Sequence, residues 1–300
     1  MGSPGFTCAI VAQRETPTTR ALVEALQASG VAARVLRPQK AVDVLGRGDV
    51  ALARLDVCQD LTGIEPGLWE LRVLEREGVR VLNPAAALRA AHDKLAAARR
   101  FTDAGLAHPR TVPLTGGTEE SPLPFPLVVK PRFGSWGRDV VLCGDEGDFA
   151  LALEELRQRP WFRPAGGVVQ ELVPPTGRDL RVIVSGGLAV GAIERVAAPG
   201  EWRTNVALGG ARHPVDPPPA ACELAVAAAV ALGLDLAGVD LLPMPDGGHV
   251  VLEVNGAPEF TPQYSRDADV FDLALRALPG ASKDEHANRQ PRPAHPSRTG

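Results

Sequence analysis

The sequence predicts an α/β protein whose first part differs in topology from the rest. Over the first 83 residues, apolar strand-like runs alternate with helical patterns, which is typical of a mostly parallel sheet with right-handed crossovers. From about residue 125 to 195, strand-like runs instead follow one another with a single helix among them, which favours an antiparallel sheet. A chain of 300 residues is long for one compact core, so two or three sub-domains are expected.

The first part is predicted to be one small α/β domain. Its helix after the first strand has clear signals: Thr16 is a suitable N-cap, Pro17 occupies the first helical position, and Gly30 lies just past the end. The expected strands cover residues 7–13, 31–38, 49–57 and 79–83, and the expected helices cover residues 16–30 and 66–78.

After Asn83 the chain is predicted to be helical to about residue 106, with a break near His92 and Asp93, where Asp93 is a natural N-cap. Further helices are expected over residues 145–158 and 217–233, and "GVDLLPMPDGGHVVLEVN" predicts a hairpin. The other expected strands cover residues 125–131, 139–144, 166–173, 178–187 and 188–196. The segment from about residue 279 has almost nothing to bury and is predicted to be a disordered tail.

Composition excludes several functions. A net charge of -4 gives no electrostatic case for nucleic-acid binding, and no apolar stretch is long enough to cross a bilayer, so neither nucleic acid nor membrane is an expected partner. The N-terminal residues lack the pattern of a signal peptide. Cysteines stand far apart without a CxxC pair, which indicates neither a zinc site nor a disulfide framework and favours a cytoplasmic protein.

The stretch "LVVKPRFGSWGRDV", residues 127–140, predicts a phosphate-binding loop. An apolar run ends in Lys130, and two glycines then flank Ser135 and Trp136. Glycines let backbone N–H groups approach phosphate oxygens closely, and the lysine adds a positive charge at the end of its strand. From this stretch alone, a plain hairpin with a solvated lysine is an equal alternative.

The C-terminal hairpin predicts a metal site. If residues 245–248 form a four-residue loop, Asp240 faces Glu253, and Asn255 shares a face with Glu253. Two facing carboxylates repel each other unless a cation lies between them, and Mg²⁺ prefers such oxygen ligands. The alternative is a solvated strand face that carries charges.

Arginines form a third cluster. Asp179 and Arg181 share one strand face, Arg195 ends the next strand, and Arg203 and Asn205 lie in a glycine-ended loop. Guanidinium groups match the oxygens of carboxylates and phosphates. Any single arginine is more simply a surface charge, but together they indicate more cationic capacity than one phosphate requires. We therefore expect a small acidic substrate.

The ordered set of lysine, glycine-rich loop, "QELV", "RDLR", "RTN", "GVDLL" and "EVN" resembles the ATP-grasp fold of carboxylate–amine ligases. Within that fold the chain is similar to RimK-type glutamate ligases and, through "GSWGR" and "EWRTNVALGG", to the LysX ligase of lysine biosynthesis. The resemblance implies a Rossmann-like pre-ATP-grasp domain (1–83), a small lobe with the lid (84–171), and a lobe with the metal site (172–278), followed by the tail (279–300).

The resemblance also implies residue roles. The predicted nucleotide-binding residues fall into four groups. Two lysines would bind the phosphates, a mobile loop would cover them, a hinge would hold the adenine and ribose, and one acidic residue would lie beside the nucleotide. In that order, the residues are Lys94 and Lys130; Ser135, Trp136 and Gly137; Gln170, Glu171 and Val173; and Asp179. The predicted catalytic residues, beside the substrate and the reacting phosphate, are Arg181, Arg195, Arg203 and Asn205. The predicted metal ligands are Asp240, Glu253 and Asn255. The segment after Asn255 departs from LysX-like chains, although Glu259 and Phe260 are retained.

The implied activity is ATP-dependent amide formation. A substrate carboxylate takes the γ-phosphate of ATP to give an acyl phosphate, and an amine then displaces phosphate. The expected cofactors are ATP and Mg²⁺, with Mn²⁺ as an alternative metal. The expected substrate is small, acidic and amino-acid-like, either free or on a carrier protein, and a homo-oligomer is compatible with the sequence. Two alternatives remain: a RimK-type enzyme that adds glutamate to a protein or cofactor tail, and a nucleotide sensor without catalysis.

Overall fold

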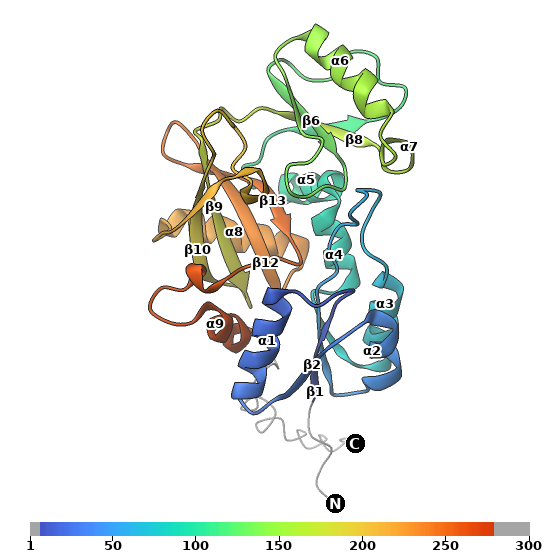
Figure 1. Cartoon of the computed structure of the whole chain (residues 1–300), viewed down its shortest axis with the longest axis vertical. Helices are drawn as coiled ribbons and strands as arrows, with labels where there is room; N and C mark the ends of the chain where they lie inside the picture. The colour runs from blue at the N-terminus through green and yellow to red at the C-terminus, as the bar shows by residue number, and fades with distance from the viewer. Residues whose placement is uncertain (1–6, 279–300) are drawn as a thin grey trace, which may run out of the picture.

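The computed structural model describes residues 7–278, which form an N-terminal domain and two further lobes (Figure 1). The predicted tail lies outside the described residues. No helix between residues 7 and 278 is long and apolar enough to cross a bilayer. The four cysteines are free thiols, and two of them, Cys8 and Cys143, are buried.

The N-terminal domain is built on a parallel sheet of order β2-β1-β3-β4. Its strands are β1 (Thr7–Val11), β2 (Ala32–Leu36), β3 (Val50–Ala53) and β4 (Arg80–Leu82), and its helices are α1 (Pro17–Ala28), α2 (Pro38–Val44) and α3 (Leu68–Glu77). Alternate residues of β1 face opposite sides: Ile10 packs in the core that includes α1, and Val11 packs in the core that includes α3. Burial on both faces explains the continuous apolar runs of this domain.

Helix boundaries in this half follow the capping signals. Thr16 caps α1, accepting a hydrogen bond from the N–H of Thr19, and Pro17 begins the helix. Asp93 breaks the next helical stretch into α4 (Ala85–His92) and α5 (Lys94–Asp103), because its carboxylate accepts the N–H groups of Leu95 and Ala96. Both expectations are confirmed. Helix α2 was not predicted.

The small lobe is an antiparallel sheet of order β5-β8-β6-β7 covered by a helix. Its elements are β5 (Thr111–Leu114), β6 (Leu127–Pro131), β7 (Val141–Cys143), α6 (Glu146–Arg157), α7 (Phe162–Ala165) and β8 (Gly167–Glu171). Phe149, Leu153 and Leu156 of α6 pack with Leu127 and Val129 of β6 in a separate core. This core is separate from the other two, and it also includes Val57 and Leu61 from the N-terminal part of the chain. The sequence did not predict β5.

The large lobe is an antiparallel sheet of order β11-β10-β9-β12-β13. Its elements are β9 (Arg178–Ser185), β10 (Leu188–Val196), the short helix η1 (Val206–Leu208), β11 (Ala211–Pro214), α8 (Pro219–Leu232), β12 (Leu236–Pro243), β13 (His249–Asn255), the short helix η2 (Pro262–Tyr264) and α9 (Val270–Ala277). Helix α8 packs on one face of this sheet, and α9 packs in the core on the other face. Strand β11 and helix α9 were not predicted.

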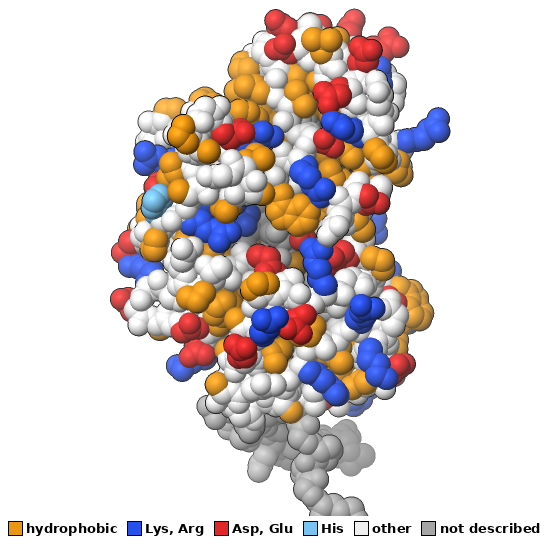
Figure 2. Space-filling model, viewed as in Figure 1, with side chains coloured by type: hydrophobic (Ala, Val, Ile, Leu, Met, Phe, Trp, Pro, Cys, Tyr) orange, Lys and Arg blue, Asp and Glu red, His pale blue; other side chains and the backbone are white. Residues whose placement is uncertain are grey.

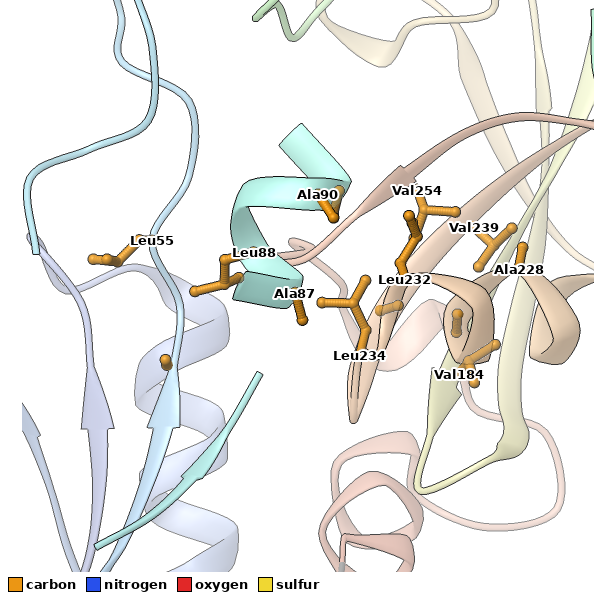
Figure 3. Packing of buried hydrophobic residues seen from close by; sticks show 14 of the residues in the cluster. Leu55, Ala87, Leu88, Ala90, Val184, Ala228, Leu232, Leu234, Val239 and Val254 are labelled. Carbon is orange, nitrogen blue, oxygen red and sulfur yellow. The ribbon is translucent and has the colours of Figure 1, made fainter. Parts of the chain in front are cut away.

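One core joins the large lobe to the N-terminal domain. Val239 and Leu232 pack together in the large lobe, and Leu88 of α4 continues the same cluster towards Leu55 (Figure 3). Asn83 reinforces this connection: its side-chain amide donates to the carbonyls of Leu236 and Gly256, both at 2.7 Å. Helices α4 and α5 contribute to this core, so they pack against the large lobe. In the sequence, they precede the small lobe. The division at residues 83, 171 and 278 stays a prediction.

The hairpin of β12 and β13 places Asp240 opposite Glu253, as predicted, but the loop length and the strand pairing differ from those expected. Pro243 pairs with His249, so the loop has five residues (244–248) and not four. A bulge between the pairs Asp240–Glu253 and Leu241–Val251 then leaves Leu252 as an extra residue. The longer loop and the bulge cancel, and the expected register at Asp240 is restored.

Candidate active site

A cavity, here called the lobe cavity, lies between the small lobe and the sheet of the large lobe. Figure 2 shows basic side chains gathered along the middle of the molecule, between the small lobe above and the N-terminal domain below. The predicted residues that line the lobe cavity are Lys94, Lys130, Ser135, Trp136, Gly137, Gln170, Glu171, Val173, Asp179, Arg195, Arg203, Asn205, Asp240 and Glu253. The other two, Arg181 and Asn255, line a neighbouring cavity.

Lys130 ends β6 as a buried cation. Its Nζ donates to Oε1 of Gln170 at 2.6 Å, and the Gln170 amide donates to Oγ1 of Thr111 at 2.7 Å, which fixes the orientation of the amide. Burial and then the charge of Lys94 lower the pKa of Lys130 to about 8, against the opposing effect of Glu253. Because burial disfavours the charged form of this lysine, an anion that binds beside it stabilises that charged form strongly.

Lys94 lies at the first position of α5, close to the glycine-rich loop. Its Nζ donates to the carbonyl of Gly134 at 2.7 Å and lies 3.7 Å from Oε2 of Glu253. Asp93 precedes it and accepts from Nε of Arg132 at 2.8 Å. The cap that begins α5 is therefore tied to the strand end that leads into the loop. Two ammonium groups and one carboxylate thus meet at the same end of the lobe cavity.

The loop of residues 132–139, here called the lid, contacts the large lobe. Nη1 of Arg203 donates to the carbonyl of Gly137 at 2.9 Å, and Arg203 is itself paired with Glu201 at 2.8 Å. Gly137 has φ +70°, and a Cβ there would lie 2.7 Å from Oδ1 of Asn205. Glycine is favoured at this position both by the backbone conformation and by the close approach. The lid is closed onto the loop that carries Arg203 and Asn205.

Two aspartates and two arginines form a largely buried network on the large-lobe sheet. Nε of Arg195 donates to Oδ1 of Asp179 at 2.7 Å, and Nη2 lies 2.8 Å from Oδ2 of Asp240. Arg181 also donates to Oδ2 of Asp240, at 2.7 Å. Burial alone raises the pKa of Asp240, but Arg181 and Arg195 hold it at about 2. Arg195 is 4% exposed and contacts both aspartates, and its predicted catalytic role stays a prediction.

The predicted metal ligands offer oxygen atoms of the right chemistry. Glu253 faces Asp240 across the hairpin, and its side chain is 31% exposed. Oδ1 of Asn255 accepts the N–H of Ala257 at 2.8 Å, which orients the amide. No group of three His, Cys, Asp or Glu side chains within residues 7–278 is arranged to hold a metal. The predicted set differs in chemistry, since it combines two carboxylates with one amide, a donor set that suits a hard ion such as Mg²⁺.

Sequence reasoning missed some residues of the site. Oγ1 of Thr204 donates to Oδ2 of Asp179, and Thr204 lies between two residues that were singled out. Arg54 follows β3 and reaches Glu259 at 2.9 Å. A charged residue within the apolar run "ALARLDV" was the available signal. The contact between Arg54 and Glu259 spans 205 positions, so the pairing itself was not visible in the sequence.

Comparison with known proteins places this geometry in a family. Residues 113–275 match the family model of the RimK-like ATP-grasp domain. The Glutamate–LysW ligase ArgX of Sulfurisphaera tokodaii is 31% identical over 259 residues, which cover 84% of this chain and 88% of that protein. A probable alpha-L-glutamate ligase of Parasynechococcus marenigrum is 38% identical over 198 residues, 62% of this chain. That match spans 40% of the relative, so the chain corresponds to less than half of its length.

A solved structure shows the same fold. The crystal structure of a RimK-domain ATP-grasp protein from Sphaerobacter thermophilus superimposes with a TM-score of 0.66 at 22% identity, over 91% of this chain and 99% of that one. The family model covers more than half of the 300 residues, and the match with the ArgX protein extends over most of both chains. The chain therefore belongs to the RimK-like ATP-grasp family of ligases.

Proposed function

We propose that this protein joins a carboxylate to an amine at the expense of ATP. The observation that carries the proposal is the meeting of Lys94, Lys130 and Glu253 at one end of a cavity between two antiparallel sheets. Paired ammonium groups there suit a triphosphate, and the facing carboxylates suit its metal ion. Family membership supports the same chemistry, because the relatives named above are ligases.

ATP binds in the lobe cavity in this proposal. The adenine and ribose lie beside β8 and the chain that follows it, near Gln170, Glu171 and Val173, and the phosphates extend towards Lys94 and Lys130. The backbone of the lid covers the phosphates, with Ser135 and Trp136 at its tip. Closure of the lid excludes water, which would otherwise hydrolyse an activated acyl group.

Asp240, Glu253 and Asn255 would hold Mg²⁺, with Mn²⁺ as an alternative. The ion supplies neutralisation of the charge that develops on the transferring phosphate. Asp240 is held in position by Arg181 and Arg195, whereas within residues 7–278 the one ion pair of Glu253 is the long contact with Lys94. Glu253 is thus the carboxylate with the greater freedom to accept a metal.

The chemical steps need positioning more than covalent help from the protein. A substrate carboxylate oxygen attacks the γ-phosphorus, the bond between that phosphorus and the β–γ bridging oxygen breaks, and ADP leaves. The amine nitrogen then attacks the acyl carbon, inorganic phosphate leaves, and the amine gives up a proton. Arg203 and Asn205 flank the lid at the place where the transferring phosphate would lie.

Glutamate is the proposed acidic substrate class. The relatives are named for glutamate, and one is named for glutamate and the protein LysW. We favour ligation of a free amino acid to an acidic group, either free or at the end of a small carrier protein, in the cytoplasm. The alternative is the RimK type, in which glutamate is added to a protein or cofactor tail. A sensor without catalysis is disfavoured, since both lysines and both carboxylates face the cavity.

ADP release measured against a panel of carboxylates and amines tests the proposal. The panel pairs L-glutamate as amine with a peptide that ends in glutamate, with N-acetyl-L-glutamate, and with a carrier protein that ends in glutamate. ADP formation that requires both partners, and a product mass that reports loss of one water, are expected. If hydroxylamine traps no acyl hydroxamate and no pair stimulates ADP release, the ligase proposal is wrong.

A further inference from the structure

The lid is attached to the rest of the molecule at both ends, by different partners. At its first residue, the guanidinium of Arg132 donates to Asp93, the N-cap of α5. At its last residue, Oδ2 of Asp139 accepts a hydrogen bond from Nε1 of Trp161 at 2.7 Å, and Oδ1 lies 3.4 Å from Nε of Arg159. Trp161 and Arg159 lie in the chain between α6 and α7. The first end of the lid is therefore held by α5 and the last end by the small lobe.

Trp161 is a fixed point of the small lobe. It is 2% exposed and packs in the core of that lobe with Phe149 and Leu153 of α6. A buried indole N–H normally has a hydrogen-bond acceptor, and here the acceptor belongs to the lid. Because packing holds the indole in place, this hydrogen bond also fixes the position of the Asp139 carboxylate.

The backbone of the lid has an unusual conformation between these attachments. Trp136, Gly137 and Asp139 all lie in the left-handed region, with φ of +61°, +70° and +53°. This region is costly for residues that have a Cβ, above all bulky ones, and such residues stay there only where surrounding contacts impose it. One such contact is the hydrogen bond from Arg203 to the carbonyl of Gly137, on the large-lobe side. The hydrogen bond between Trp161 and Asp139 is the corresponding contact on the small-lobe side.

We propose that Asp139 is a positioning residue that fixes the small-lobe end of the lid, so that Gly137 reaches Arg203 and the lid covers the phosphates. The inference rests on the proposed ligase function and deepens it. Without the hydrogen bond to Trp161, the lid opens more often and admits water. Water then hydrolyses the acyl phosphate to the free carboxylate and inorganic phosphate, so ADP forms without an amide. Asp139 thereby directs the activated carboxylate to the amine.

Asp139→Gly and Asp139→Asn separate the carboxylate from the backbone conformation. Glycine accepts φ +53° but removes the acceptor, whereas asparagine tolerates this region and keeps an oxygen that can accept from Trp161. The measurement is the ADP released in excess of the amide formed, with an acid and an amine that the chain joins. This excess should increase by about tenfold in Asp139→Gly, the effect of one hydrogen bond to a charged group, and stay within about twofold in Asp139→Asn. No increase in Asp139→Gly, or an equal increase in both variants, would overturn the inference.

Glu155→Ala is the matched control. Glu155 pairs with the same Arg159 at 2.6 Å, but it lies on α6, outside the lid, and its side chain is 64% exposed. The excess of ADP should stay at the wild-type level in this variant. An increase as large as in Asp139→Gly would show that the effect does not come from the lid.

Trp161→Phe removes the same hydrogen bond from the other side and keeps an aromatic ring in the core. It should raise the excess of ADP as Asp139→Gly does. The double variant should be no worse than either single variant, because both changes remove one interaction. Additive effects in the double variant would overturn the pairing of Asp139 with Trp161.

Nucleotide binding without turnover separates this inference from the ligase proposal. The probes are the non-hydrolysable ATP analogue AMP-PNP with Mg²⁺, and adenosine, which has no phosphates. Asp139→Gly should raise the Kd for AMP-PNP by about tenfold and leave the Kd for adenosine within about twofold, because the lid covers the phosphates. A general disturbance of the small lobe would weaken both, since the proposed adenine site lies beside β8 of that lobe.

If the wild type forms no ADP with any acid and amine, the ligase proposal fails, and the ratio of the two Kd values still decides the role of Asp139. Equal changes in the two Kd values, or no change in either, would reject that role.

Discussion

The two walls of the lobe cavity differ in how their charges are held. On the large-lobe wall, Asp179, Arg195 and Asp240 are buried and Arg181 is partly buried, and the four satisfy one another on three neighbouring strands. On the small-lobe wall, Lys130 is buried with one amide partner, and the lid carries Trp136 at 38% exposure. The difference indicates that the two walls have different roles. The large lobe presents a fixed template, and the small lobe presents cations that an incoming anion has to satisfy.

The largest effect is expected on the large-lobe wall. Asp240→Asn removes a carboxylate that the buried Arg195 and the partly buried Arg181 share, and leaving buried charge without its partner costs about 3–5 kcal/mol of unfolding free energy. Turnover should be lost as well. Urea unfolding and ADP release measure the two effects. Asp216→Asn, which breaks the exposed pair with Arg266, is the control and should change stability little. An Asp240→Asn protein as stable as the wild type would show that the network is not a fixed template.

The next effect should separate function from stability on the same hairpin. Glu253→Gln removes a charge that is partly exposed and makes one long ion pair, so the unfolding free energy should change little. Turnover should fall by about 100-fold or more, because one proposed ligand charge beside the phosphate is lost. Titration with Mg²⁺ at fixed ATP is the measurement, and a shift to higher Mg²⁺ is expected. Normal Mg²⁺ dependence in Glu253→Gln would remove Glu253 from the metal site.

Lys130 should make nucleotide affinity depend on pH. Its folded-state pKa of about 8 lies below the ordinary value of 10.5, so the folded chain without nucleotide releases this proton before the unfolded chain does. Bound phosphates favour the charged form, so the Kd for ATP should rise as pH increases above about 8, by up to tenfold per unit. The same shift predicts stability that increases between about pH 8 and 10.5 from this group. Calorimetric titration with ATP from pH 7 to 9.5 measures the effect.

Lys130→Arg and Lys130→Met are the paired variants for that measurement. Arginine stays charged over the whole range, so its Kd should lose the dependence on pH. Methionine removes the charge and should weaken ATP binding by about 10- to 100-fold at pH 7. A wild-type Kd that stays constant up to pH 9.5 would contradict the view of the small-lobe wall as a set of unsatisfied cations.

The smallest effect is expected at the lid. Gly137→Ala forces a side chain into a backbone conformation with φ +70° and into Asn205, at a cost of about 1–2 kcal/mol for the closed lid. The KM for ATP should rise by about 5- to 30-fold with little change in Tm. Gly117→Ala is the control, because a Cβ at Gly117 would meet no atom within 4 Å. An unchanged KM in Gly137→Ala would show that the contact between lid and large lobe does not contribute to nucleotide binding.

Much of the fold was visible in local patterns. The cap at Asp93, the alternation of the N-terminal domain and the strand of Lys130 each depend on residues close in sequence. Elements with weak patterns were missed: α2 is one short helix, and the residues of β11 are all exposed. The register of the hairpin was correct only because the bulge at Leu252 compensated for the longer loop.

The sequence by itself determined which chemical groups are present and in what order, because capping, strand alternation and turn residues act over a few positions. It was sufficient to predict the cations of the small lobe and the carboxylates of the hairpin. Only the tertiary structure decided how those groups pair. Arg195 contacts both Asp179 and Asp240, and Arg54 meets Glu259, which lies 205 positions away in the sequence. Which buried charges are satisfied, and which still need a partner, depends on contacts between elements far apart in sequence, since burial makes each unpaired charge costly.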